Sequence, residues 1–110
     1  MELDVLRRLA KQISDKRDEL RALETCGMME EVTKAYQELS TLEAKFEMTK
    51  TALYKQICAR VPEGKQRLVL IYRYVGLEKF SSIENEMCMS ASYVQKLHNE
   101  GKKKYEAGGG

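Results

Sequence analysis

An apolar side chain returns at every seventh position through the middle of this chain. The repeat consists of Val32, Leu39, Phe46 and Leu53, with Tyr36, Leu42 and Ile57 on the same side. Apolar residues at this spacing lie along one side of a long α-helix. The pattern predicts a single helix over residues 29–60, about 45 Å long at ~1.5 Å per residue.

A shorter apolar repeat comes before it. Its members, at helical spacing, are Leu3, Leu6, Leu9, Ile13, Leu20 and Leu23. Lys16 interrupts the series, although its aliphatic stem can cover apolar surface while its amine reaches water. We expect an amphipathic helix over residues 2–24, ended by Gly27 as a C-terminal cap. Because the connection is short, the two helices must form an antiparallel hairpin, an arm that spans residues 1–61.

The two helices of this arm differ in length, and a hairpin buries apolar surface on one side only. The C-terminal part of the chain, a second copy in a homodimer through residues 1–60, or another protein could cover the remainder. The alternative is a coiled-coil spacer that has no specific partner.

Pro62 separates the arm from the C-terminal part. It suits the first position of a helix, where a missing N–H costs nothing, and Glu63 suits the positive end of the helix dipole. Residues 67–75 have the composition of a buried strand, but the chain offers no partner strand. We therefore predict a helix over residues 63–75, ended by Gly76. Its expected core face consists of Leu68, Ile71, Tyr72 and Val75.

Two shorter helices are predicted next, over residues 80–87 and 90–104. Their expected buried residues are Phe80, Ile83 and Met87 in the first and Val94 and Leu97 in the second. Ser90 is a good N-cap for the second. A short helix, a three-residue turn and a capped helix are the elements of a helix-turn-helix.

The predicted fold class is all-α, with a long antiparallel helical hairpin followed by a three-helix helix-turn-helix domain. The domain is expected to span residues 62–107, and residues 108–110 form a flexible glycine tail.

Three motifs follow one another in residues 65–105. One helix ends in "RYVG", the next helix and turn read "IENEMCMS", and the last helix begins "SASYVQKLH". In this order they resemble the C-terminal promoter-reading domain of bacterial sigma factors. A charged helical hairpin placed before such a domain is similar in layout to small sigma-like transcriptional regulators of Gram-positive phages and prophages. The resemblance implies that the last helix reads DNA in the cytoplasm of a bacterial host cell.

Two residues depart from the family pattern. Cys88 stands where the turn usually has glycine, and a left-handed conformation there costs it on the order of 1 kcal/mol. Glu84 stands where the family packs a small residue between the two helices. Either its carboxylate escapes to the edge of the domain, or the helices are splayed at this point.

Matching the motif residue by residue implies a set of DNA contacts. The base-facing residues are Ala91, Ser92, Gln95 and Lys96, with Tyr93 and His98 beside them. Phosphate contacts are expected from Ser82, Asn99, Lys102, Lys103 and Lys104. Glutamine is suited to adenine and lysine to guanine. Four lysines on phosphates would give a salt slope of about −3.6, too little for tight binding by one copy.

Composition narrows the remaining classes of function. The chain has 110 residues and a net charge of +2, with 10 Lys and Arg against 11 Asp and Glu in residues 1–59, and 9 against 6 thereafter. This bias towards nucleic acid is weak. Its three cysteines lack a CxxC pair, which suits small buried thiols in a reducing cytosol better than disulfides or zinc. No signal peptide and no membrane span are visible. No catalytic constellation or cofactor motif is present, so we expect no enzyme.

Two functions fit these observations. The first is a phage-type DNA-binding regulator, whose arm dimerises or contacts RNA polymerase while its helix-turn-helix binds double-stranded DNA. The alternative is a phage protein that inhibits a host machine, either RNA polymerase or a CRISPR or other defence nuclease. It would occupy a surface of that machine through the arm or through a degenerate helix-turn-helix.

Overall fold

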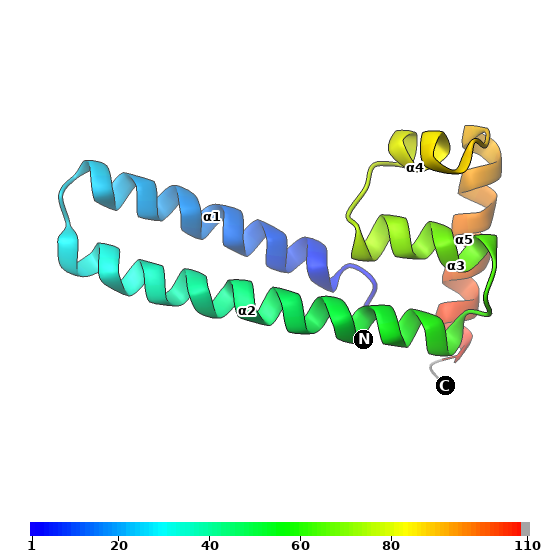
Figure 1. The fold of residues 1–110 in the computed structure, drawn as a ribbon, viewed down its shortest axis with the longest axis horizontal. Coiled ribbons are helices and arrows are strands. Elements are labelled where there is room, and N and C mark those ends of the chain that lie inside the picture. Colours follow the sequence, from blue (N-terminus) through cyan, green and yellow to red (C-terminus); the bar gives the residue numbers. More distant parts are fainter. Residues whose placement is uncertain (109–110) are drawn as a thin grey trace. The chain divides into compact units, whose positions relative to one another are not determined.

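The computed structural model describes residues 1–108, and their regular structure is entirely helical (Figure 1). The elements are α1 (Val5–Thr25), α2 (Met29–Arg60), α3 (Lys65–Leu70), the π-helical turn η1 (Ile71–Val75), α4 (Phe80–Met87) and α5 (Ala91–Gly108). The all-α prediction is confirmed, including the choice of helix over strand for residues 67–75. None of the helices in residues 1–108 is long and apolar enough to cross a lipid bilayer.

Contacts divide the chain into two compact units. Residues 4–50 form one, which we call the hairpin unit. Residues 1–3 form the other together with residue 51 onward, and we call it the helix-turn-helix unit. The division falls inside α2, whereas the sequence suggests a boundary at Pro62. The last turns of α2 therefore pack with the helix-turn-helix.

In the hairpin unit, α1 leads into α2 through a glycine turn. Gly27 has a φ of +70°, and its N–H donates to Glu24 O at 3.1 Å. The N–H of Met28 donates to Leu23 O at 3.0 Å. These two bonds form a Schellman motif, in which glycine adopts the left-handed conformation without a Cβ clash. The predicted cap and hairpin are confirmed.

The two helices of this unit share an apolar seam. Its buried residues are Ile13, Leu20, Val32, Ala35 and Leu39, with Leu23, Leu42 and Phe46 half-buried beside them. Most of the predicted apolar positions thus face each other within one copy of the chain. The exception is Tyr36, which is 52% exposed.

Lys16 joins the two helices instead of only reaching water. Its Nζ lies 2.6 Å from Glu38 Oε2 and 2.9 Å from Glu19 Oε2. The hydrogen bond to Glu38 is the main cause that raises the pKa of Lys16, and the same bond lowers the pKa of Glu38. The charged residue in the seam is therefore a link between α1 and α2.

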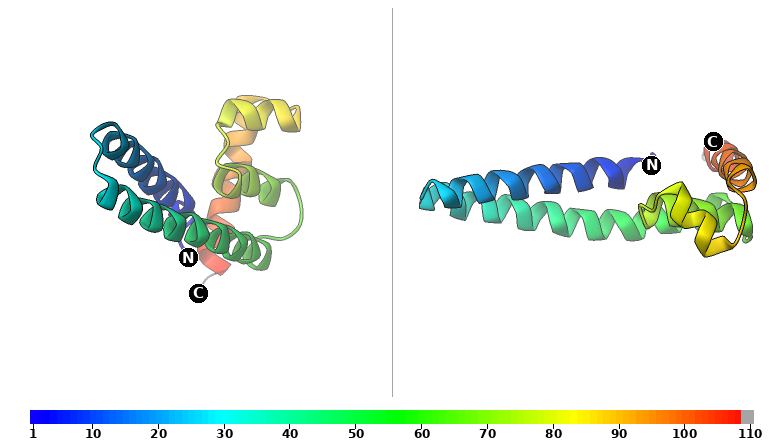
Figure 2. Two further views of the ribbon diagram at one scale, coloured as in Figure 1. Left: turned by 60° about the vertical axis from the view of Figure 1, so that its left-hand side comes forward. Right: turned by 90° about the horizontal axis from the view of Figure 1, so that it is seen from above.

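The helix-turn-helix unit packs around a core shared by three helices. Val69 comes from α3, Ile83 from α4, and Val94 and Leu97 from α5. Figures 1 and 2 show α3 and α4 lying against α5. The burial predicted for Ile83, Val94 and Leu97 is confirmed.

The core face predicted for residues 63–75 is wrong in part, although Tyr72 does pack against the core. Leu68 is 46% exposed, whereas Val69, Leu70 and Tyr74 are buried. In η1, the N–H of Gly76 donates to Ile71 O, five residues earlier, at 2.9 Å. A π-turn holds one more residue than an α-turn. Tyr74 lies four residues after Leu70, so the two side chains share one side of the helix.

The start of α3 also differs from the prediction. The helix begins at Lys65, after Gly64 with a φ of +146°. Pro62 and Glu63 therefore lie in the connection, and the assignment of both to a first helical turn is wrong.

Arg67 gives the physical reason. Its Nε donates to Val61 O at 2.8 Å, and its Nη2 donates to Cys58 O at 3.0 Å. These carbonyls belong to the end of α2, where a cation also favours the helix dipole. The guanidinium folds the connection back onto α2, which delays the next helix.

The turn between α4 and α5 is left-handed at Cys88, with φ 52° and ψ 49°. The N–H of Cys88 donates to Asn85 O at 3.3 Å, and that of Met89 donates to Glu84 O at 3.0 Å. The predicted strain at Cys88 is confirmed. Glu84 is half-buried, and no buried side-chain nitrogen or oxygen in residues 1–108 lacks a hydrogen-bond partner. Its carboxylate is therefore not trapped between the helices.

The last helix is longer than predicted. α5 extends to Gly108, where a Cβ would lie 3.1 Å from Arg60 Cβ. Gly108 is therefore the last residue of α5 and lies close to the end of α2. Residues 109–110, the rest of the predicted glycine tail, lie outside the described residues.

The cysteines are less buried than the sequence suggests. Cys26 and Cys88 are exposed, and Cys58 is half-buried. The expectation of small buried thiols is therefore wrong for the first two, both of which lie at helix ends.

Candidate nucleic-acid interface

The helix α5 has one buried side and one exposed side. Its buried residues are Val94, Leu97, His98, Gly101 and Tyr105. Consecutive residues of an α-helix point about 100° apart, which places Ser92, Lys96, Asn99 and Lys103 on the opposite side. All four are exposed. We call these four residues the outer face of α5.

The C-terminal half of α5 is anchored within its own unit. The Tyr105 hydroxyl donates to Met1 O at 2.5 Å, and the Arg60 guanidinium lies 4.6 Å from the centre of the Tyr105 ring. Burial raises the pKa of Tyr105, and the charge of Arg60 opposes this shift. A Cβ at Gly101 would lie 3.1 Å from Gln66 O, so α3 and α5 approach closely. These contacts fix the direction of the outer face.

The N-terminal end of α5 is fixed by Ser90. The N–H of Tyr93 donates to Ser90 Oγ at 3.3 Å, and the N–H of Val94 donates to Ser90 O at 3.0 Å. This is the N-cap that the sequence predicts. The first turn of α5, which includes Ser92, is therefore well ordered.

The arginines of the helix-turn-helix unit hold the fold together. Arg73 donates to Glu78 O at 2.9 Å, and its guanidinium lies 4.4 Å from the centre of the Phe80 ring. Arg67 donates to carbonyls at the end of α2, and Arg60 lies over the Tyr105 ring, as described above. The cations left to meet an outside anion are therefore lysines.

Most of the predicted DNA contacts are exposed. These are Ala91, Ser92, Tyr93, Gln95, Lys96, Asn99, Lys102, Lys103 and Lys104, while Ser82 is half-buried. The three consecutive lysines do not form one patch, because they point about 100° apart. Only Lys103 belongs to the outer face, and Lys102 and Lys104 lie to either side of it.

The side of α5 that carries Lys104 meets a residue that sequence reasoning missed. Lys65 Nζ lies 5.9 Å from the centre of the Tyr93 ring. Lys65, Tyr93 and Lys104 line a hollow of about 310 Å³ that Glu63 also borders. The carboxylate partly balances the two ammonium groups, so this flank is less basic than its lysines suggest.

His98 is not retained as a DNA contact, because its ring is only 8% exposed. Its Nε2 lies 2.6 Å from the Tyr74 hydroxyl, and the two rings stack with their centres 5.6 Å apart. Phe80 meets the imidazole edge-on at 5.1 Å. Sequence reasoning missed Tyr74 as its partner, because the expected core face of residues 63–75 did not include Tyr74.

His98 is nevertheless linked to the exposed side of α5. Its Nδ1 lies 3.2 Å from Asn99 Oδ1, and the Gln95 amide donates to the same oxygen at 3.5 Å. A hydrogen-bonded series thus runs from Tyr74 in the core to Gln95 and Asn99 at the surface. No pattern in the sequence indicates this series.

Comparison with protein-family models, with curated proteins and with solved structures finds no match to this chain. Within residues 1–108, no three His, Cys, Asp or Glu side chains gather as metal ligands would. The geometry of α5 is therefore the strongest indication of function in the molecule.

Proposed function

We propose that this chain is a regulator that binds double-stranded DNA by laying α5 in the major groove. The observation that carries the proposal is the outer face of α5, where Ser92, Lys96, Asn99 and Lys103 are all exposed, while the exposed Glu106 follows on the same side at the C-terminal end of the helix. The helix is capped at its start and anchored at its end. In a helix-turn-helix, the second helix enters the major groove with its exposed side towards the bases.

The chemistry of this face suits such a groove. Gln95 lies beside it, and a glutamine amide matches the adenine edge, whereas Lys96 matches guanine O6 and N7. Lys103 lies two helical turns beyond Lys96, about 10 Å along the axis. The major groove is about 12 Å wide, so the Lys103 ammonium group can reach a phosphate at the rim of the groove.

The lysines also set the expected salt dependence. On DNA of random sequence, where Lys96 has no matched guanine to contact, Lys96 and Lys103 each neutralise a phosphate and together give a slope of about −1.8 in log affinity against log salt. Contacts by Lys102 and Lys104 as well would double it to about −3.6. One copy therefore binds DNA with modest affinity, and a second copy or RNA polymerase would share the task.

Fluorescence anisotropy with a labelled duplex of random sequence tests the proposal. The full chain is titrated at several salt concentrations beside a Lys96→Ala/Lys103→Ala variant. We expect the double variant to flatten the salt slope by about 1.8. The matched control is Lys45→Ala, an exposed lysine of the hairpin unit. A wild-type chain without salt-dependent binding, or an equal loss in the control, would overturn the proposal.

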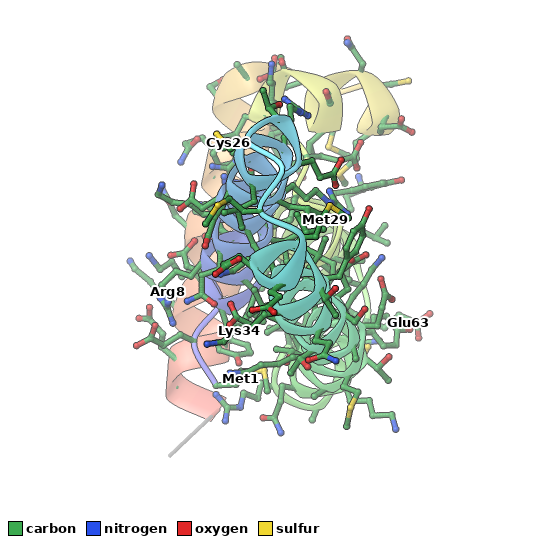
Figure 3. The ribbon with its side chains drawn as sticks, turned by 90° about the vertical axis from the view of Figure 1, so that its left-hand side faces the viewer. Met1, Arg8, Cys26, Met29, Lys34 and Glu63 are labelled. Atoms are coloured by element: carbon green, nitrogen blue, oxygen red, sulfur yellow. The ribbon has the colours of Figure 1, made fainter. Side chains whose placement is uncertain are left out.

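A second candidate function rests on the tip of the hairpin unit (Figure 3). Met28 is 44% exposed, Met29 68% and Tyr36 52%. Methionine side chains adapt to apolar partner surfaces, and the neighbouring Glu30 and Glu31 favour a partner with basic residues around the contact. This candidate is the inhibitor of a host machine, with the tip as its contact.

Purified bacterial RNA polymerase is the first probe for this candidate. Immobilised polymerase is exposed to the full chain and to a Met28→Ser/Met29→Ser variant. The matched control is Met48→Ser, because Met48 is 75% exposed elsewhere in the hairpin unit. Loss of binding by the tip variant alone supports the candidate. A wild-type chain that does not bind polymerase removes that partner.

A further inference from the structure

Two side-chain nitrogens converge on one amide oxygen at the outer face of α5. Asn99 Oδ1 lies 3.2 Å from His98 Nδ1 and 3.5 Å from the donating Gln95 Nε2. An amide oxygen has two lone pairs, and these two partners occupy both. The Asn99 side chain is exposed, which leaves its NH₂ group available to an outside acceptor.

The role of His98 as a donor follows from its other nitrogen. The Tyr74 hydroxyl lies 2.6 Å from His98 Nε2. When this hydroxyl donates to Nε2, the neutral imidazole carries its proton on Nδ1. Nδ1–H then donates to Asn99 Oδ1. Tyr74 and Phe80 pack against the imidazole and hold its orientation.

We infer that Asn99 reads guanine in the major groove, and that Tyr74 and His98 are positioning residues that hold its amide for this task. The inference rests on the proposed binding of DNA by α5. Neither positioning residue touches the base, since each acts through the hydrogen bond to the next.

Guanine follows from the donors and acceptors of each base. Adenine binds an asparagine through both the oxygen and the NH₂ of the side-chain amide. Adenine N6 donates to the oxygen, and adenine N7 accepts from the NH₂. That oxygen is already engaged in Asn99. Guanine presents two acceptors, N7 and O6, to an outward NH₂ group, whereas thymine presents only one, O4, and cytosine presents a donor.

The amide of Gln95, in contrast, still has both a donor and an acceptor to offer a base. One of its N–H groups donates to Asn99, which leaves the other N–H and the amide oxygen available. These two groups match the acceptor and the donor of adenine. The two amides of α5 therefore have different preferences, although both belong to a residue type that ordinarily reads adenine.

The base assignment is tested on duplexes selected from a random pool by the full chain. Each base pair of the selected site is then changed singly, and binding is measured by anisotropy. We expect one position where wild type prefers guanine over adenine by about tenfold, within the range of a good amide contact. Asn99→Ala should abolish this preference and leave the others in place.

Substitutions at the positioning residues separate orientation from folding. In His98→Asn, the amide NH₂ lies close to the former position of Nδ1 and can still donate to Asn99. In His98→Gln, the amide NH₂ lies close to the former position of Nε2 instead. We expect His98→Asn to retain the guanine preference and His98→Gln to reduce it to about twofold. Tyr74→Phe, which removes a single hydroxyl, should behave like His98→Gln. Affinity for random duplex should stay unchanged in all three, which a merely structural role would not predict.

The proton on His98 is observable without DNA, by ¹⁵N NMR of the full chain near neutral pH. We expect the neutral ring to be protonated on Nδ1. Protonation on Nε2 would overturn the inference whether or not DNA binds. Equal binding of guanine and adenine at every position of a selected site would overturn the inference alone. Failure to recover any duplex would overturn the proposed function, and the base assignment with it.

Discussion

The hairpin unit and the helix-turn-helix unit are stabilised in different ways. The hairpin unit relies on a regular apolar seam, with one charged residue, Lys16, that bridges its two helices. The helix-turn-helix unit adds specific polar contacts to its core, among them those of Arg67, Tyr105 and His98. Regular packing is thus sufficient for the hairpin unit, whereas specific polar contacts also fix the orientation of α5 in the helix-turn-helix unit.

The same contrast appears in the backbone. Each unit contains a Schellman turn, with Gly27 in the left-handed position in one and Cys88 in the other. The helix-turn-helix unit also contains the π-turn η1 and a second left-handed residue, Leu77, with a φ of 55°. Less favourable conformations are therefore concentrated in the unit that carries the candidate interface.

The largest expected difference concerns the two cores. Ile83 is fully buried among three helices, whereas Leu20 is 7% exposed in a two-helix seam. Ile83→Ala should lower the free energy of unfolding by about 4 kcal/mol and Leu20→Ala by about 2 kcal/mol, because the first leaves an enclosed cavity. Urea denaturation measures both, and hydrogen exchange locates the loss. Equal losses, spread over both units, would contradict the contrast.

The two Schellman turns should respond in opposite directions. Cys88→Gly should raise the free energy of unfolding by about 1 kcal/mol, because glycine adopts the left-handed conformation without strain. Gly27→Ala should lower it by a similar amount for the same reason. Cys26→Gly is the control, since Cys26 has a right-handed conformation and gains nothing from glycine. Thermal unfolding checks all three, and a destabilised Cys88→Gly variant would contradict the account.

The smallest effect is expected from the Lys16–Glu38 bridge. The lowered pKa of Glu38 means that its contribution is present above the ordinary pKa of 4.5 and is lost as the pH falls through the lower folded value. The raised pKa of Lys16 means that its contribution is present below 10.5 and is lost as the pH rises through the higher folded value. Both groups are near solvent, so the effect is small.

Melting curves across pH, compared between wild type and Glu38→Gln, isolate this bridge. The two proteins should differ most near neutral pH and converge in acid. Lys11→Ala is the control, because Lys11 pairs only with Asp15 on the same helix and both are well exposed. A constant difference down to the lowest pH would show that the bridge is not the cause.

The sequence predicts the regular part of this structure well. The seven-residue repeat indicates α2 and the hairpin, Gly27 indicates the turn, and Ser90 indicates the start of α5. These predictions succeed because each depends on local spacing or on one cap.

The irregular part was not predictable in this way. The core face of residues 63–75 depends on packing against α4 and α5, and the late start of α3 depends on Arg67 reaching the end of α2. Helical spacing alone gives the exposure of Lys96 and Lys103, but nothing local indicates that Tyr74 would meet His98. Contacts between distant residues decide these features.

The central claim is that the helix-turn-helix unit, through α5, meets DNA. An ¹⁵N-labelled full chain titrated with a duplex tests it residue by residue in one NMR experiment. We predict progressive shifts of the backbone or side-chain amides of Ser92, Gln95, Lys96 and Asn99, with residues 4–50 unchanged. Shifts confined to residues 4–50, or none at any concentration of duplex, would contradict the claim.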